Sequence, residues 1–205
     1  MKIYLLLAHP DKNSFNGQIA DAYYTSAIEK GHTVRYQKLA EMTFDPILRK
    51  GYQVEQTLES DLIAAQQNIL WCDKWVIIYP VWWGNLPALL KGFIDRTLTP
   101  GFAFNYHDKD PFWDKLLKGR TAELIATSDA PGWWIWWQYR NSDVHALKHA
   151  TLNYCGFEHI SVRRITRVRF LSKVQRKQKI KEICDRITQA TELVHDQHRS
   201  SPVLP

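Results

Sequence analysis

The stretch with the clearest chemical potential is Pro80–Pro87, PVWWGNLP, which follows a strongly apolar run. That run, residues 75–79, is typical of a strand buried on both faces, as in a parallel sheet. Pro80 cannot donate a hydrogen bond to a neighbouring strand, so it is expected to end this one. Asn85 is predicted to cap the helix that follows, and Pro87 to lie in its first turn.

Two adjacent indoles, Trp82 and Trp83, therefore lie with Gly84 at the carboxyl end of a central strand. In open α/β sheets, ligands bind at that edge. Backbone N–H groups beside flat aromatic walls suit a planar, hydrogen-bonding, electron-accepting ring. A flavin fits this description.

A second candidate, residues 9–16, follows the first apolar run. Ser14 and Asn16 can cap a helix or donate hydrogen bonds, and the free N–H groups of a helix start bind phosphate readily. His9 adds a hydrogen bond, and a positive charge when it is protonated near an anion. The alternative is an ordinary capped helix with a packed imidazole. Phosphate binding is favoured because the expected fold places this turn beside the Trp82-Trp83 loop.

Strand-like and helix-like segments alternate along the whole chain. Strands are expected at 2–8, 32–38, 75–79, 121–127 and 158–164, and helices at 17–30, 57–71, 86–98, 143–155 and 172–195. Loops are expected at 100–119 and through the tryptophan run at 133–137. Five strand–helix units with right-handed crossovers form a doubly wound parallel α/β sheet. The flavodoxin-like order 2-1-3-4-5 is favoured because the first turn lacks the Gly-x-Gly-x-x-Gly of dinucleotide-binding sheets.

The composition indicates a globular protein with one main domain. The 205 residues are 45% hydrophobic and 23% charged, and we expect a single domain over 1–198 with a frayed tail at 199–205. The three cysteines match neither a disulfide framework nor a zinc site, so no metal is expected. The first strand is too short for a signal peptide, and no segment approaches the roughly 18 to 20 apolar residues of a membrane span. These features predict a soluble, cytoplasmic protein without membrane insertion.

The net charge of +6 arises largely after Arg163. A basic region requires that nucleic-acid binding be considered. However, the lysine-rich segment 173–181 has the pattern of a solvated helix face, and the aromatic residues lie elsewhere. We therefore expect no nucleic-acid partner. The charge instead favours anionic ligands such as nucleotides and phosphates.

Several of these motifs together resemble the flavodoxin-like NAD(P)H:quinone oxidoreductases, the DT-diaphorase family. The matching residues are His9-Pro10, Ser14-Phe15-Asn16, the segment 80–96 (PVWWGNLPALLKGFIDR), 101–106 (GFAFNY) and 154–157 (YCGF). The resemblance spans roughly residues 1 to 165. It implies a homodimeric flavoenzyme that holds FMN or FAD tightly and passes a hydride from NADH or NADPH to a quinone or similar acceptor.

The resemblance also implies roles for individual residues. The phosphate end of the flavin would contact His9, Ser14, Phe15 and Asn16. The isoalloxazine ring would be flanked on one side by Pro80, Val81, Trp82, Trp83 and Gly84, and on the other by Thr127, Ser128, Asp129 and Ala130. Oriented N–H groups in these loops can stabilise the negative charge of a reduced flavin. Because flavin N5 carries the chemistry, no acid or base residue is assigned.

The chain departs from the best-known family members after the fourth strand. There the family has a glycine-rich loop followed by a tyrosine and a histidine that assist hydride transfer. In this chain Tyr139 and His145 are poorly spaced to correspond to that pair. Instead, four indoles occupy five positions from Trp133 to Trp137. They either wall an acceptor slot or form a dimer interface, or do both. The residues expected to bind the acceptor are Trp133, Trp134, Phe104 and Tyr106.

Two other functions fit the same motifs. Some relatives with this fold are ancillary regulatory subunits of a cation-efflux antiporter, a role that would require a membrane-protein partner. A flavodoxin-type electron carrier is less favoured, because such carriers are typically acidic and this chain has a net charge of +6.

Overall fold

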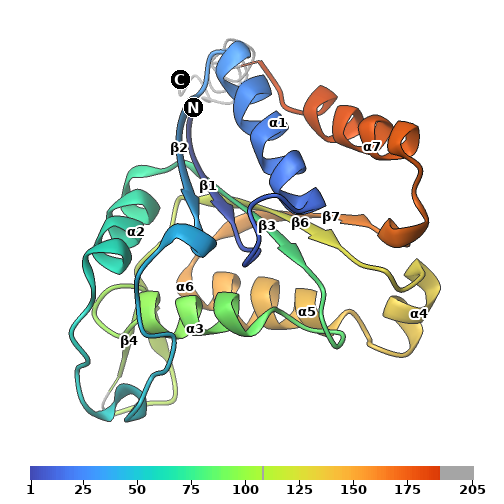
Figure 1. Cartoon of the computed structure of the whole chain (residues 1–205). Coiled ribbons are helices and arrows are strands. Elements are labelled where there is room, and N and C mark those ends of the chain that lie inside the picture. The colour runs from blue at the N-terminus through green and yellow to red at the C-terminus, as the bar shows by residue number, and fades with distance from the viewer. Residues whose placement is uncertain (108, 190–205) are drawn as a thin grey trace, which may run out of the picture.

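The computed structural model describes residues 1–107 and 109–189, and its centre is a five-stranded parallel sheet (Figure 1). The strand order β2-β1-β3-β6-β7 confirms the predicted flavodoxin-like topology. The sheet strands are β1 (Lys2–Leu7), β2 (Thr33–Lys38), β3 (Lys74–Pro80), β6 (Thr121–Thr127) and β7 (Glu158–Ile165). The predicted frayed tail at 199–205 lies outside the described residues.

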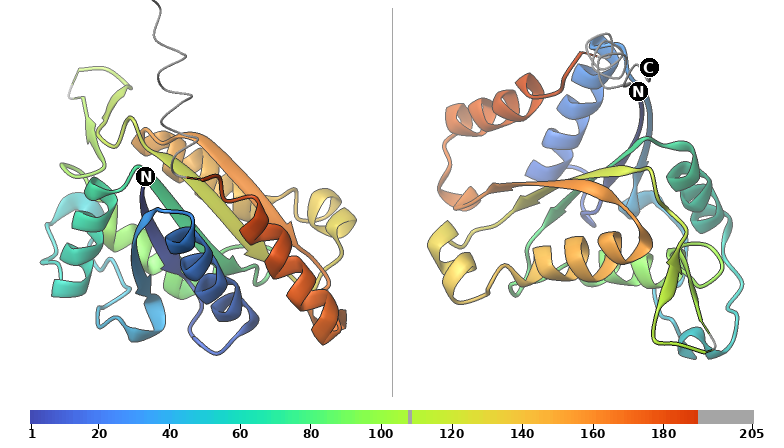
Figure 2. Two further views of the ribbon diagram at one scale, coloured as in Figure 1. Left: turned by 90° about the horizontal axis from the view of Figure 1, so that it is seen from above. Right: turned by 180° about the vertical axis from the view of Figure 1, so that it is seen from behind.

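Helices cover both faces of the sheet (Figure 2). One face carries α1 (Phe15–Glu29) and α7 (Lys173–Asp185), and the other carries α2 (Ser60–Trp71), α3 (Ala88–Thr97) and the helical segment from α5 (Ser142–Val144) to α6 (Asn153–Cys155). The side chains of β1 alternate between the two cores, with Leu5 towards α1 and Leu6 towards α2. Because both faces are covered, β1 and β3 are apolar after their first residue.

The tryptophan run forms a short helix, α4 (Gly132–Trp137), instead of the predicted loop. Ile135 is its buried residue and anchors it to the protein, whereas Trp133, Trp136 and Trp137 are exposed. The helix predicted at 143–155 is present, but His145–Leu152 has π-helical turns. Short 3₁₀ turns occur at Leu39–Glu41, Gly51–Gln53 and Val168–Phe170.

The predicted loop at 100–119 contains a two-stranded hairpin of β4 (Phe104–Tyr106) and β5 (Trp113–Lys115). The Trp113 indole holds it against the protein by stacking on Tyr154, with ring centroids 4.2 Å apart. The same indole N–H donates to the Tyr154 carbonyl at 2.8 Å. This contact depends on tertiary structure, which explains why local sequence gave no strand signal.

The last helix ends at Asp185, so the prediction that it continues towards 195 was wrong for the described residues and is untested from 190 onwards. Lys30, the residue directly after α1, binds the carboxyl end of this last helix. The Lys30 ammonium donates to the carbonyl of Cys184 at 2.8 Å and also to that of Ile187. A cation that binds the last carbonyls of a helix stabilises its end. Among the residues that the structure describes, no helix is long and apolar enough to cross a bilayer.

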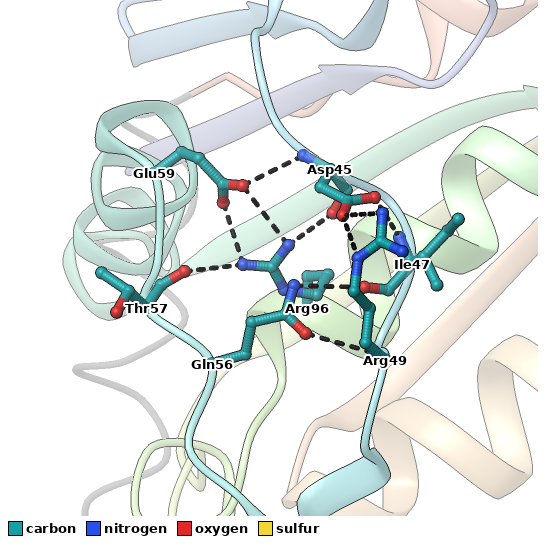
Figure 3. A network of polar contacts seen from close by, with 7 residues as sticks. All are labelled: Asp45, Ile47, Arg49, Gln56, Thr57, Glu59 and Arg96. Atoms are coloured by element: carbon teal, nitrogen blue, oxygen red, sulfur yellow. Dashed lines mark hydrogen bonds and ion pairs between the residues drawn. The ribbon is translucent and has the colours of Figure 1, made fainter.

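Arg96 on α3 fixes the long connection between β2 and α2 (Figure 3). Its side chain is only 1% exposed. The guanidinium donates to the carbonyls of Asp45 and Thr57, and it pairs with the Glu59 carboxylate at 3.0 Å. One buried side chain thus satisfies two backbone carbonyls of this connection.

Replacing Arg96 with alanine is expected to lower the free energy of unfolding by roughly 2 to 4 kcal/mol, because two backbone carbonyls lose their donor, Glu59 loses its partner and a buried side chain is removed. Urea unfolding followed by circular dichroism measures the change. The matched control is Arg49→Gln, which removes an exposed partner of Asp45 in the same network. That control should cost less than about 1 kcal/mol, and equal losses in the two variants would contradict the role given to Arg96.

Candidate functional site

A pocket of about 250 Å³ lies where β1, β3 and β6 end, and we call it the strand-end pocket. Three chain segments and one residue after β7 form it. Its lining residues are His9, Ser14, Phe15, Asn16, Pro80, Val81, Trp82, Thr127, Ser128, Asp129 and Val168. The structure therefore brings together the predicted flavin-contacting residues apart from Trp83, Gly84 and Ala130.

The first wall is the start of α1. Ser14 is its N-cap, and its hydroxyl accepts the N–H of Gly17 at 3.2 Å. Phe15 and Asn16 are the first two helical residues, whose N–H groups have no acceptor one turn earlier. Gly17 allows this turn to close, because a Cβ there would lie 1.8 Å from the Lys12 carbonyl oxygen. The result is a helix start that presents N–H groups for an anion.

Asn16 joins this wall to the end of β6. Its side chain is 2% exposed, and its amide oxygen accepts the Thr127 hydroxyl at 2.7 Å. Its amide nitrogen is buried and has no hydrogen-bond partner among residues 1–107 and 109–189. A buried donor without an acceptor is costly. This orphaned donor in the pocket wall fits a ligand that carries hydrogen-bond acceptors.

His9 is a neutral donor at the edge of the pocket. Its Nδ1 accepts the Asp11 N–H at 2.9 Å, which leaves the ring proton on Nε2. Burial lowers the pKa of His9 from its usual value, an effect that the nearby Asp11 partly opposes. The ring lies edge-on to Trp82, with centroids 5.6 Å apart. His9 can therefore donate a hydrogen bond without carrying a charge at neutral pH.

The second wall is a tight turn from Trp82 to Asn85. The two residues exchange main-chain hydrogen bonds of 3.0 and 2.9 Å. Trp83 and Gly84 between them have φ of 52° and 73°, as in a type I′ turn. The Asn85 side chain accepts the N–H of Leu86, so the prediction that Asn85 caps α3 was wrong. The helix begins at Ala88, and Pro87, predicted in its first turn, instead directly precedes it.

This turn is held by the segment that follows α4. A Cβ on Gly84 would lie 2.9 Å from the Tyr139 ring. The Ser142 hydroxyl donates to the Gly84 carbonyl, and Tyr139 lies edge-on to Trp134 at 6.4 Å. Trp83, whose indole is fully exposed, is strained for a bulky residue. The surrounding contacts must hold the turn in that conformation.

The third wall follows β6 and is tied to β7. The Thr127 carbonyl accepts the Val81 N–H at 2.7 Å. The Ser128 N–H donates to the Ile165 carbonyl at 2.9 Å, and the Ser128 carbonyl accepts the Val168 N–H at 3.1 Å. Val168 was not identified from the sequence, because an apolar residue after a strand has no chemical signature. These bonds fix the position of the loop relative to the sheet.

Arg176 on α7 was also missed. Its guanidinium donates to the Val168 carbonyl at 3.1 Å and lies 5.3 Å from the centre of the Phe15 ring. Both contacted residues line the strand-end pocket. The sequence interpretation assigned this residue to a solvated basic helix face, and only the packing of α7 against α1 reveals the contact. Arg176 places positive charge beside the helix start.

A second hollow of about 510 Å³ adjoins the first through Asp129, and we call it the aromatic groove. Its lining residues are Asp129, Ala130, Pro131, Trp133, Trp134, Arg167, Arg169 and Phe170. Two of the predicted acceptor-binding residues, Trp133 and Trp134, lie here.

Phe104 and Tyr106 lie elsewhere. They are on the β4–β5 hairpin, across the molecule from α4 (Figure 1). Phe104 is buried edge-on against Tyr106 and Tyr154, both at 5.1 Å. Within one chain the structure does not bring this pair to the aromatic groove.

The strand-end pocket can thus hold two kinds of chemical group. Its helix start, the orphaned Asn16 amide and the neutral His9 donor suit a phosphate or another polar, acceptor-rich group. The apolar and indole surfaces of Val81 and Trp82 suit a planar ring. Together these features fit a flavin nucleotide.

The comparisons with known proteins agree with this fold and site. Residues 1–190 match the family model described as having a flavodoxin-like fold, and the chain belongs to that family. An uncharacterised NAD(P)H oxidoreductase of Haemophilus influenzae is 30% identical over 203 residues, covering 93% of this chain and 95% of that protein.

Two further relatives carry more specific names. Rat ribosyldihydronicotinamide dehydrogenase [quinone] is 28% identical over 188 residues, covering 77% of this chain and 78% of that protein. The crystal structure of a putative quinone reductase from Klebsiella pneumoniae is similar, with a TM-score of 0.75 and 26% identity, over 91% of this chain and 83% of that one.

Gly84→Ala is expected to destabilise the protein more than Gly119→Ala. Both glycines have a positive φ, of 73° and 77°, so both variants lose roughly 1 to 2 kcal/mol from backbone strain. Only at Gly84 does the new methyl group meet a ring, whereas nothing lies within 4 Å at Gly119. The clash should add roughly 1 to 3 kcal/mol. Thermal and urea unfolding of both variants measures the difference, and equal losses would show that Tyr139 does not restrain the turn.

Proposed function

We propose that this protein is a flavin-dependent NAD(P)H oxidoreductase of the quinone reductase type. The observation that carries the proposal is the strand-end pocket, which combines an anion-binding helix start with an indole wall at the carboxyl ends of parallel strands. The names of the H. influenzae, rat and K. pneumoniae relatives support the same activity.

The overall reaction converts NAD(P)H, a proton and a quinone into NAD(P)⁺ and a hydroquinone. When bound, a flavin supplies an N5 atom that accepts a hydride and returns two electrons. The protein's own residues would bind and orient this flavin. Ser14 and the N–H groups of Phe15 and Asn16 hold the flavin phosphate. His9 donates a hydrogen bond from Nε2 at the edge of the pocket. Val81, Trp82 and the 127–129 segment enclose the ring and exclude water.

We further propose a cytoplasmic homodimer in which residues 1–198 form one flavin-binding domain. The exposed indoles of α4 and the exposed Tyr106 support association, because large exposed aromatic patches mark interaction surfaces. Phe104 and Tyr106 lie far from the aromatic groove of their own chain. In this proposal the exposed Tyr106 reaches an acceptor site only from a second copy, while the buried Phe104 supports the Tyr106 ring from behind. Trp133 and Trp134 wall that site directly.

Purified protein is expected to bind one FMN or FAD per chain at micromolar concentration, with flavin absorbance and quenched fluorescence. Anaerobic NADH or NADPH should then bleach the flavin band, and an added quinone should restore it. Separate reconstitution with each flavin shows which one is held. Absence of binding by both flavins would overturn the proposed function.

Replacing Ser14 and Asn16 together with alanine is expected to weaken flavin binding by roughly 1 to 3 kcal/mol, because hydrogen bonds to a charged group are lost. The matched control is Ser172→Ala, which removes the N-cap of α7 at a residue that does not line the pocket. Both variants lose a helix cap, but only the double variant should lose flavin affinity, as measured by fluorescence titration. Flavin reduction at saturation should change little in either variant, and a large loss there would contradict a purely binding role.

A further inference from the structure

The aromatic groove combines flat rings with cationic groups. The Trp133 and Trp134 indoles lie 5.5 Å apart at 82° to one another. Across the groove, the guanidinium groups of Arg167 and Arg169 lie 5.4 and 4.6 Å from the centre of the Phe170 ring. Such a surface offers stacking faces for a planar ligand and two fixed donors for an anion.

The two guanidinium groups have no acidic partner of their own. Within residues 1–107 and 109–189, neither makes a side-chain hydrogen bond or an ion pair with a carboxylate. The carboxylate that lines the groove, Asp129, accepts the main-chain N–H of Arg169 at 2.8 Å. Two cationic side chains against one carboxylate leave the groove positively charged.

The backbone holds these arginines beside the loop that encloses the strand-end pocket. Arg167 has a φ of 57°, a left-handed conformation that is uncommon for a residue other than glycine. The Val168 N–H donates to the Ser128 carbonyl, and the Arg169 N–H donates to the Asp129 carboxylate. Both bonds keep this segment against the loop. Strained conformations persist where surrounding contacts impose them, and they cluster at ligand sites.

We propose that the aromatic groove selects electron acceptors that carry an anionic substituent on a planar aromatic ring. The ring lies against Trp133 and Trp134, and the carboxylate, sulfonate or phosphate substituent binds Arg167 and Arg169. This inference rests on the proposed function. We assign the groove to the electron acceptor because the groove is open to solvent. The Trp133 side chain is 63% exposed and the Phe170 side chain 59%. An open groove suits a ligand that exchanges in every catalytic cycle better than a permanently bound group.

The test compares naphthoquinone sulfonate with unsubstituted naphthoquinone as acceptors of the flavin-loaded enzyme. In Arg167→Gln/Arg169→Gln protein, kcat/KM for the sulfonate should fall about tenfold, as expected for lost charge-assisted hydrogen bonds. The value for the neutral quinone should stay within about twofold of that of the unaltered protein. The matched control, Lys118→Gln/Lys177→Gln, removes the same net charge at exposed positions outside the groove and should leave the ratio unchanged.

A second pair of variants tests the stacking surface. Trp134→Ala removes a ring that lines the groove, whereas Trp136→Ala removes an exposed indole of the same helix that does not line it. The first should lower kcat/KM for both quinones about threefold or more. The second should leave both values unchanged. Equal losses in the two variants would show that the acceptor does not stack on the Trp134 indole.

Parallel measurements separate the other possible occupants. If the double arginine variant loses affinity for FAD but not for FMN, the groove holds the adenylate half of the cofactor and the proposal is wrong. A raised KM for NADPH but not for NADH would assign the arginines to the extra ribose phosphate of the donor, which also overturns it. Unaltered protein that reduces neither quinone would refute the proposed function, whereas reduction of both with an unchanged ratio in the variant would refute only the selectivity.

Discussion

The hydrogen bond between the Thr127 hydroxyl and the Asn16 amide oxygen sets the shape of the site. It joins the end of β6 to the start of α1 across 111 residues of sequence, and both side chains are buried. Because buried polar groups must be paired, the two elements cannot separate without a cost in free energy. This short contact therefore holds two walls of the strand-end pocket, the start of α1 and the end of β6, next to each other.

The rest of the site divides into a rigid part and a more adaptable part. The strand-end pocket is built on the ends of central strands and is tied by the main-chain bonds of Val81 and Val168. The aromatic groove and the exposed Trp83 turn lie on loops and a short helix outside the sheet. A rigid scaffold that carries variable outer loops is the usual way in which one fold holds the same bound group and serves different substrates.

The fold and much of the strand-end pocket could be predicted because their signals are local. Apolar strands alternate with amphipathic helices along the sequence. Ser14 has the residue type of a helix N-cap and indicates the start of α1, and the Trp82-Trp83 loop directly follows the apolar strand β3. The remaining features depend on tertiary contacts. The run at 133–137 has no polar face to reveal a helix, and tertiary contacts such as the burial of Ile135 fix it. Lys30, which follows α1 in the chain, binds the carboxyl end of α7. The position of Arg176 depends on the packing of α7 against α1.

The chain order of the pocket residues constrains how the protein is made. His9 comes from the first turn, but Val168 follows the last strand of the sheet. During synthesis, the helix start and its N–H groups leave the ribosome long before the loop after β6 and the strand that supports it. A nascent chain has no complete pocket until almost all of the sheet has emerged. Capture of a ligand is therefore among the last events of assembly, and it stabilises the finished fold rather than guiding the early one.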